Sequence, residues 1–173
     1  MASCSLSQAG VVFSDVQTVT GASGASVAAE VLDHYEEGAW TPTYSATGCT
    51  FSYGGANYGK YTRIGNLCHC NGYLDTNSSV SGTTGNAVDI HGIPFTPWSP
   101  GGLGYQPLAL SFFIHINFQN VDGAGISMHY LTGSPYIRPY HIQDAASPGN
   151  VTAAQMAGTA DSRIAFQGPY MIG

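Results

Sequence analysis

Charge is the scarcest property of this sequence. Charged residues make up 8% of the 173 residues, against about 25% in ordinary soluble domains. The four basic residues are dispersed along the chain: Lys60, Arg63, Arg138 and Arg163. With a net charge of −6, nothing matches the row of phosphates that a nucleic acid presents, so we predict no nucleic-acid partner. A surface so poor in charge also predicts that copies of the chain or other proteins cover much of it.

Long apolar runs are absent as well. No stretch approaches the roughly 20 apolar residues of a membrane helix, and residues Met1 to Gly10 lack the basic and apolar regions of an export signal. We therefore expect neither a membrane partner nor secretion. In a reducing compartment the four cysteines, Cys4, Cys49, Cys68 and Cys70, are then expected to be free thiols, although their even number leaves disulfides open.

Helical periodicity is rare. Only Val27 to Tyr35 and Val151 to Gly158 favour a turn or two of helix. After Gly38, short β-type runs alternate with Gly, Pro, Asn and Asp, and about nine such runs are typical of a sandwich. We predict an all-β fold, an antiparallel β-sandwich that is jelly-roll-like, with at most one or two short helices.

Two segments show the alternation most clearly. Between Gln106 and Phe118 every second residue is large and apolar, which predicts one long strand with a buried face. Phe113 falls on the opposite face and is a candidate interface residue. In Lys60 to Asp75, alternation places Cys68 and Cys70 on one face and His69 on the other.

The chain divides into two parts by composition. Residues 1–30 are mostly small and polar and end in a Gly/Ser-rich stretch, so we predict an N-terminal arm and linker, followed by the sandwich domain at 31–173. The apolar residues of the arm, Val11, Val12 and Phe13, are candidate interface residues. The Ser/Thr/Gly-rich segments 75–86 and 97–105 are predicted to be surface loops that contact partners.

Few residues suggest chemistry. Asp33, Glu36 and Glu37 form the densest carboxylate cluster, but the two carboxylates of a glycosidase flank the sugar, and a local cluster is better explained as a turn-forming acidic patch. Alternation in a strand would also prevent Cys68, His69 and Cys70 from binding one zinc ion. No nucleophile elbow or phosphate-binding glycine loop occurs. We predict no catalytic residue, no metal site and no cofactor.

Aromatic residues are the richer signal, with 11 Tyr, 7 Phe and 2 Trp. Tyrosine offers a large contact area at a low entropic cost, which suits both sugar stacking and subunit contacts. Tyr136 and Tyr140 are candidate interface residues on this ground, while many of the other tyrosines are expected in the core.

Three segments resemble structural proteins of tailed bacteriophages, often those at the C-terminal ends of tail fibres. LDHYEEGAWTPTY at 32–44, YGKYTRIGNLCHCNGYL at 58–74 and GIPFTP at 92–97 follow the pattern DxYEEGTWTPT … GxYTKIGxxV … GLPF in the same order. His34, Ala39 and Arg63 replace the commoner residues, and Cys68 and Cys70 also depart from the pattern. The matching residues are Asp33, Tyr35, Glu36, Glu37, Gly38, Trp40, Tyr61, Ile64, Gly65, Pro94 and Phe95.

The resemblance implies a trimeric β-sandwich of the virion, assembled in the host cytoplasm, with no enzymatic activity. It also implies structural roles for the motif. Asp33, Glu36 and Gly38 would shape the turn into the first strand, Trp40 would anchor that strand, and Tyr61 and Ile64 would pack the next one.

The motif begins at Leu32, which leaves no room for a fibre shaft before it. We therefore interpret the chain as a capsid decoration (cement) protein or short head fibre, which forms a homotrimer and binds the phage major capsid protein. The alternative is the tip of a tail or head fibre that recognises a host-surface glycan. A glycan-cleaving enzyme is the third hypothesis.

Overall fold

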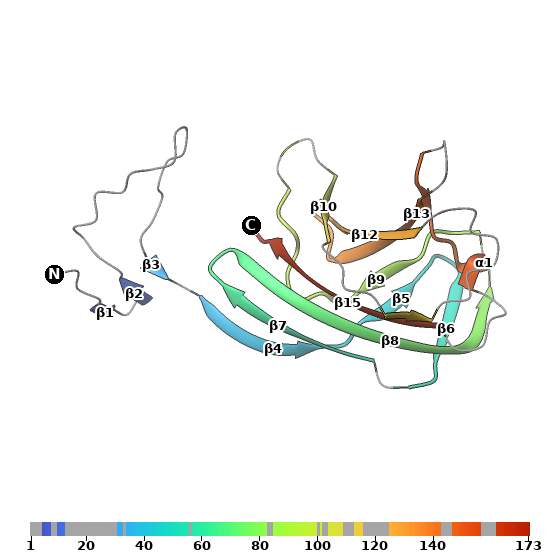
Figure 1. Ribbon diagram of the computed structural model, residues 1–173, viewed down its shortest axis with the longest axis horizontal. Coiled ribbons are helices and arrows are strands. Elements are labelled where there is room, and N and C mark those ends of the chain that lie inside the picture. The colour runs from blue at the N-terminus through green and yellow to red at the C-terminus, as the bar shows by residue number, and fades with distance from the viewer. Residues whose placement is uncertain are drawn as a thin grey trace.

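A computed structural model places the chain in an all-β fold (Figure 1). The structure describes residues 5–7, 10–12, 31–32, 34–55, 57–82, 85–99, 101, 104–108, 113–115, 125–142, 147–156 and 162–173. Two antiparallel sheets face each other, which confirms the predicted β-sandwich. The predicted boundary between an arm at 1–30 and a domain at 31–173 stays a prediction.

One sheet is built around β13 and is called the β13 sheet. Its strands run in the order β10, β12, β13, β9, β5, and β14 pairs with β13 beside this path. The bounds are β10 Tyr105–Pro107, β12 Gly125–Leu131, β13 Tyr136–Ile142, β9 Asp89–His91, β5 Thr43–Ser45 and β14 Gly149–Asn150.

The other sheet ends at β4 and is called the β4 sheet. Its strands run in the order β11, β15, β8, β7, β4, and β6 pairs with one end of β8. The bounds are β11 Phe113–His115, β15 Ser162–Met171, β8 Leu67–Gly82, β7 Tyr58–Ile64, β4 Tyr35–Trp40 and β6 Cys49–Tyr53.

A third, small sheet joins β1 (Ser5–Ser7), β2 (Gly10–Val12) and β3 (Val31–Leu32). It is drawn beside the sandwich in Figure 1, at the end where β4 begins. The helix predicted for Val27 to Tyr35 is wrong where the structure describes it. Val31 and Leu32 pair with β2, and Tyr35 opens β4, because pairing with neighbouring strands outweighs a weak local helix propensity.

The predicted long strand from Gln106 to Phe118 is also wrong. Its start lies in β10, which pairs with β12, and its middle lies in β11, which pairs with β15 in the other sheet. Leu108 lies beyond the end of β10 yet is buried, as its alternation predicted. Alternation indicates which side chains are buried, but it does not indicate that the paired strand changes from β12 to β15 between β10 and β11.

The predicted loop at 75–86 is mostly strand, because β8 continues to Gly82 and pairs with β6. This part of β8 keeps an inward face despite its Ser/Thr-rich composition, because Thr76 is buried and Val80 packs against the core. The predicted turn of helix in Val151 to Gly158 is present as α1, Ala153–Met156. Within the described ranges this 4-residue segment is the longest helix, whereas a membrane-crossing helix needs about 20 residues.

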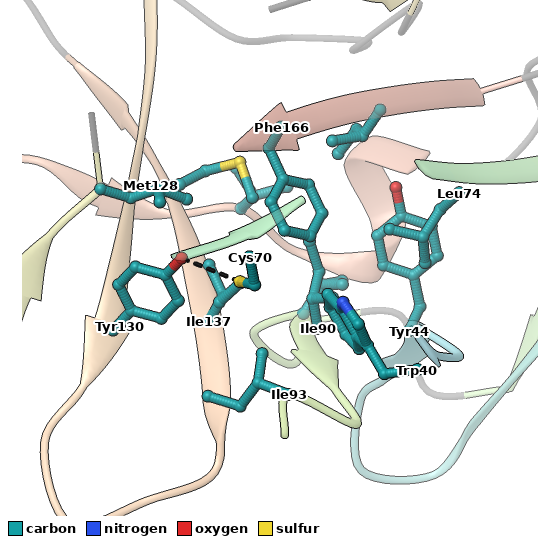
Figure 2. Close-up of a cluster of buried hydrophobic side chains, with 14 of the residues drawn as sticks. Trp40, Tyr44, Cys70, Leu74, Ile90, Ile93, Met128, Tyr130, Ile137 and Phe166 are labelled. Atoms are coloured by element: carbon teal, nitrogen blue, oxygen red, sulfur yellow. Dashed lines mark hydrogen bonds between the residues drawn. The ribbon is translucent and has the colours of Figure 1, made fainter. Parts of the chain in front are cut away.

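The core lies between the two sheets (Figure 2). Alternate residues of β8 and β15 point inward and meet inward-facing residues of β12, β13 and β9. Tyr130 reaches across from the β13 sheet: its hydroxyl hydrogen-bonds to Cys70 Sγ at 3.1 Å and donates to the Gly168 carbonyl at 3.1 Å. This buried polar pairing links the two layers of the sandwich.

Candidate interaction surfaces

The three segments that carry the phage resemblance meet at the β4 edge of the sandwich. β4 pairs with β7 from Tyr35 opposite Ile64 to Trp40 opposite Gly59. Phe95, from the third segment, packs edge-on against Tyr61, with ring centroids 5.5 Å apart at 87°. Segments separated in the sequence therefore form one structural cluster.

Glycines and aromatic rings alternate within this cluster. Trp40 is paired with Gly59, and a Cβ built on Gly59 would lie 2.2 Å from the indole Nε1. Tyr61 is paired with Gly38, and a Cβ there would lie 2.4 Å from the Tyr61 ring. Each ring thus occupies the space that a side chain on its partner would need, which gives the Gly and aromatic positions of the motif a packing explanation.

Trp40 is fixed by a hydrogen bond as well as by packing. Its indole Nε1 donates to the carbonyl of Asn71 on β8 at 2.8 Å, across the intervening β7. Gly92, with φ of 95°, lies against it: a Cβ there would lie 3.6 Å from the indole and 2.6 Å from the Thr41 carbonyl oxygen. These contacts suit the anchoring role that the resemblance implies for Trp40.

The remaining motif residues lie around the same cluster. Gly65, with φ of 55°, takes the first central position of the two-residue turn between β7 and β8, where a type II′ turn needs glycine. Phe95 is held by Tyr170, whose hydroxyl accepts from the Phe95 N–H at 3.3 Å. The Arg63 guanidinium lies 5.0 Å from the centre of the Phe95 ring. Pro94, which precedes Phe95 in the sequence, is half-buried.

The two described carboxylates of the acidic cluster point to opposite faces of the sheet edge, because they are neighbours in a strand. Glu36 accepts a hydrogen bond from the Tyr61 hydroxyl on the inner face, and Glu37 accepts one from Tyr35 on the outer face. The hydrogen bond with Glu37 raises the pKa of Tyr35, and that with Glu36 raises the pKa of Tyr61. Asp33 lies outside the described residues. Glu36 and Glu37 therefore do not face a common site.

An exposed apolar row crosses the outer face of the β4 sheet. Tyr35, Ile64, Leu67 and Met171 are register partners on β4, β7, β8 and β15. Their exposed fractions are 64%, 44%, 44% and 43%. We call these four residues the apolar row. Single exposed apolar residues are ordinary, but four that are register neighbours are a candidate interaction surface.

The predicted interface residues fall in different places. Val11 and Val12 lie in β2, where the structure describes their backbone pairing only, and Phe13 lies outside the described residues. Phe113 pairs with Ala165 at the edge of the β4 sheet. Tyr136 and Tyr140 are half-buried on the other sheet.

The outer face of the β13 sheet carries stacked rings. His129 lies between two tyrosines, with its ring centroid 4.8 Å from that of Tyr105 and 5.1 Å from that of Tyr140. Its Nε2 hydrogen-bonds to the Ser127 hydroxyl at 2.9 Å, whereas its buried Nδ1 has no hydrogen-bond partner among the described residues. Burial lowers the pKa of His129. On the same face His91 stacks on Tyr136 at 5.0 Å.

An ion pair lies beside these rings. Arg138 donates from Nε to Asp89 Oδ1 at 2.7 Å and from Nη2 to Oδ2 at 2.9 Å, a bidentate arrangement. Hydrogen bonding to Asp89 raises the pKa of Arg138. The two residues lie 49 positions apart, so no short-range sequence pattern predicted the ion pair. The alternation of Tyr136, Arg138 and Tyr140 along one strand was the available signal that these side chains share a face.

The side chains of the Cys68-His69-Cys70 segment point as predicted. Cys68 and Cys70 are buried and His69 is exposed. Burial raises the pKa of both thiols, that of Cys70 to about 12. Cys68 and Cys70 are free thiols, and Cys4 lies outside the described residues. Among the residues that the structure describes, no three His, Cys, Asp or Glu side chains are grouped to hold a metal ion.

Comparison of the chain with models of known protein families finds no match, and comparison with curated proteins finds none either.

Proposed function

We propose that the protein is a non-enzymatic structural protein of a tailed-phage virion, and specifically a capsid decoration protein that assembles as a homotrimer on the major capsid protein. The proposal starts from the motif resemblance at 32–44, 58–74 and 92–97. The observation that carries it furthest is the apolar row, which supplies a surface suited to contact with other subunits.

The chemistry of the apolar row favours assembly over ligand binding. All four side chains of the apolar row are uncharged. Its first residue, Tyr35, is separated from the end of β3 by only two residues. Depletion of charge and enrichment in aromatic residues and methionine are typical of the buried part of subunit interfaces. A chain with 8% charged residues would then keep its apolar surface away from water by contact with its own copies.

A decoration protein acts by binding the assembled shell more strongly than the dissociated one. Such binding shifts the equilibrium toward the intact particle by mass action. The test is to compare particles that have and lack this protein during heating and osmotic shock. We expect the particles that lack it to release DNA at a lower temperature and after a milder shock. Equal resistance in the two preparations would refute the decoration role.

The second candidate function is recognition of a host-surface glycan by a fibre tip. The stacked Tyr105, His129 and Tyr140 rings on the outer face of the β13 sheet support it, because aromatic side chains provide apolar contact beside polar groups. Labelled protein should then bind host cells and lose that binding when Tyr105 and Tyr140 are changed to alanine. A protein that acts only in capsid decoration should bind capsids and should not bind host cells.

A further inference from the structure

The Asp89–Arg138 ion pair lies in a hollow on the outer face of the β13 sheet. The hollow has a volume of about 420 Å³ and is lined by residues that include Ser45, Asn86, Asp89, His91, Tyr136 and Arg138. This volume falls within the range of about 300–1,000 Å³ that small-ligand sites occupy. Arg138 and Asp89 keep 23% and 15% of their side-chain exposure, so a ligand in the hollow can reach both.

The hollow has a fixed shape. Asn86 Nδ2 donates to the Thr47 carbonyl at 2.8 Å and ties together the segments that follow β5 and precede β9. The two rings at the opposite side, His91 and Tyr136, are nearly parallel at 10°. The Arg138 guanidinium lies 5.6 Å from the centre of the Tyr136 ring and is held by Asp89 on its other side. A ligand would therefore meet positioned groups.

The ion pair determines which ligand chemistry fits. Two N–H groups of Arg138 are used by Asp89, which leaves three of the five guanidinium donors and the remaining lone pairs of the carboxylate. Donors and acceptors are thus presented side by side, an arrangement that matches neighbouring hydroxyl groups, each of which both donates and accepts. The pair is neutral as a whole, so neither a phosphate nor an ammonium group is favoured by net charge.

We propose that this hollow is a binding site for an uncharged, hydroxyl-rich saccharide. The Asp89–Arg138 pair hydrogen-bonds to adjacent hydroxyls, Ser45 and Asn86 add polar contacts at the rim, and the His91–Tyr136 rings supply the apolar contact for the sugar C–H groups. The inference goes beyond the decoration role, and the hollow is separate from the Tyr105, His129 and Tyr140 rings that support the second candidate function. The proposed site binds the saccharide and does not cleave it.

Saturation-transfer NMR on the full chain tests the site. The probes are neutral oligosaccharides (maltotriose, isomaltotriose, lactose and cellotriose), with sialyllactose as the anionic comparison. We expect transfer to at least one neutral probe. Arg138→Lys, which keeps the charge but loses the fork, should weaken its binding by about tenfold or more, as expected when hydrogen bonds to a charged group are lost.

Ser45→Trp provides a variant that leaves the ion pair intact. Ser45 is exposed on β5, so an indole there should fill the hollow and abolish binding without unfolding the chain. Ser52→Trp, at an exposed position of β6, is the matched control and should bind as the unchanged protein does. Absence of transfer from all four neutral probes, stronger binding of sialyllactose, or undiminished binding by Ser45→Trp would overturn the proposal. None of these outcomes bears on particle stability, so the decoration role is judged separately.

Discussion

The indole ring of Trp40 fills the space above Gly59, its register partner on the neighbouring strand. The Gly59→Ala change would place a methyl group 2.2 Å from the indole Nε1 and 2.6 Å from the Asn71 carbonyl oxygen. The ring is buried and the carbonyl belongs to the β8 backbone, so neither can move freely. We expect a loss of about 1–3 kcal/mol in the free energy of unfolding, measured by denaturant titration.

Gly104→Ala is the control for this prediction. A Cβ on Gly104 meets no described atom within 4 Å, so the same chemical change should be nearly neutral or slightly stabilising. Equal effects of the two changes would show that the Trp40–Gly59 contact does not constrain the fold.

The two buried thiols should be inert in the folded protein. Burial raises the pKa of Cys68 and Cys70, the latter to about 12, so almost no thiolate exists at pH 8, and the thiolate is the reactive form. In a Cys4→Ser/Cys49→Ser variant, a chromogenic disulfide reagent should react negligibly at pH 8 and should titrate both thiols after unfolding. Rapid reaction of the native variant would contradict the buried placement of these side chains.

Stability should depend on the titration of His129. Burial lowers the pKa of His129 below the 6.5 of an exposed histidine. A lowered folded-state pKa means that the stabilising contribution is complete above the unfolded-state pKa and is lost as the pH falls through the folded-state pKa. Unfolding measured from pH 7.5 to pH 5 should therefore show less loss of stability in His129→Gln than in the unchanged protein.

The titration can also be followed directly. An NMR titration should give a pKa below 6.5 for the His129 ring, since protonation of Nδ1 would bury a donor without an acceptor among the described residues. A pKa at or above 6.5 would contradict this explanation.

Sequence patterns predicted local features better than pairings. The alternation in Leu67 to Leu74 predicted the buried Cys68 and Cys70 and the exposed His69, because a strand with one buried face fixes the direction of every side chain. The same pattern failed between Gln106 and Phe118, where β10 and β11 take partners in different sheets. Alternation identifies a buried face but not the strand that lies beside it.

The candidate surfaces also depend on which strands are neighbours in each sheet. Tyr35, Ile64 and Leu67 lie within the motif segments, yet Met171 joins them only through the pairing of β15 with β8. The Asp89–Arg138 ion pair likewise exists because β9 and β13 are neighbours. Both surfaces are products of strand order, which no short-range pattern specifies.

The apolar row should control self-association. An Ile64→Lys/Leu67→Lys variant places two charges on an exposed face, so the subunit should stay folded while burial of the row in an interface becomes costly. Light scattering should report a trimer for the unchanged chain and a monomer for the variant. Thr50→Lys, at an exposed position of β6, should remain trimeric. A variant that stays trimeric would show that the trimer uses another surface.

The most direct measurement is electron microscopy of purified particles of the phage that encodes this chain, with the unchanged protein and with the Ile64→Lys/Leu67→Lys variant. We expect trimeric density on the head, centred on local threefold positions, with the unchanged protein, and the loss of this density with the variant. Density confined to the tail, or a head with no added density in either preparation, would contradict the decoration role.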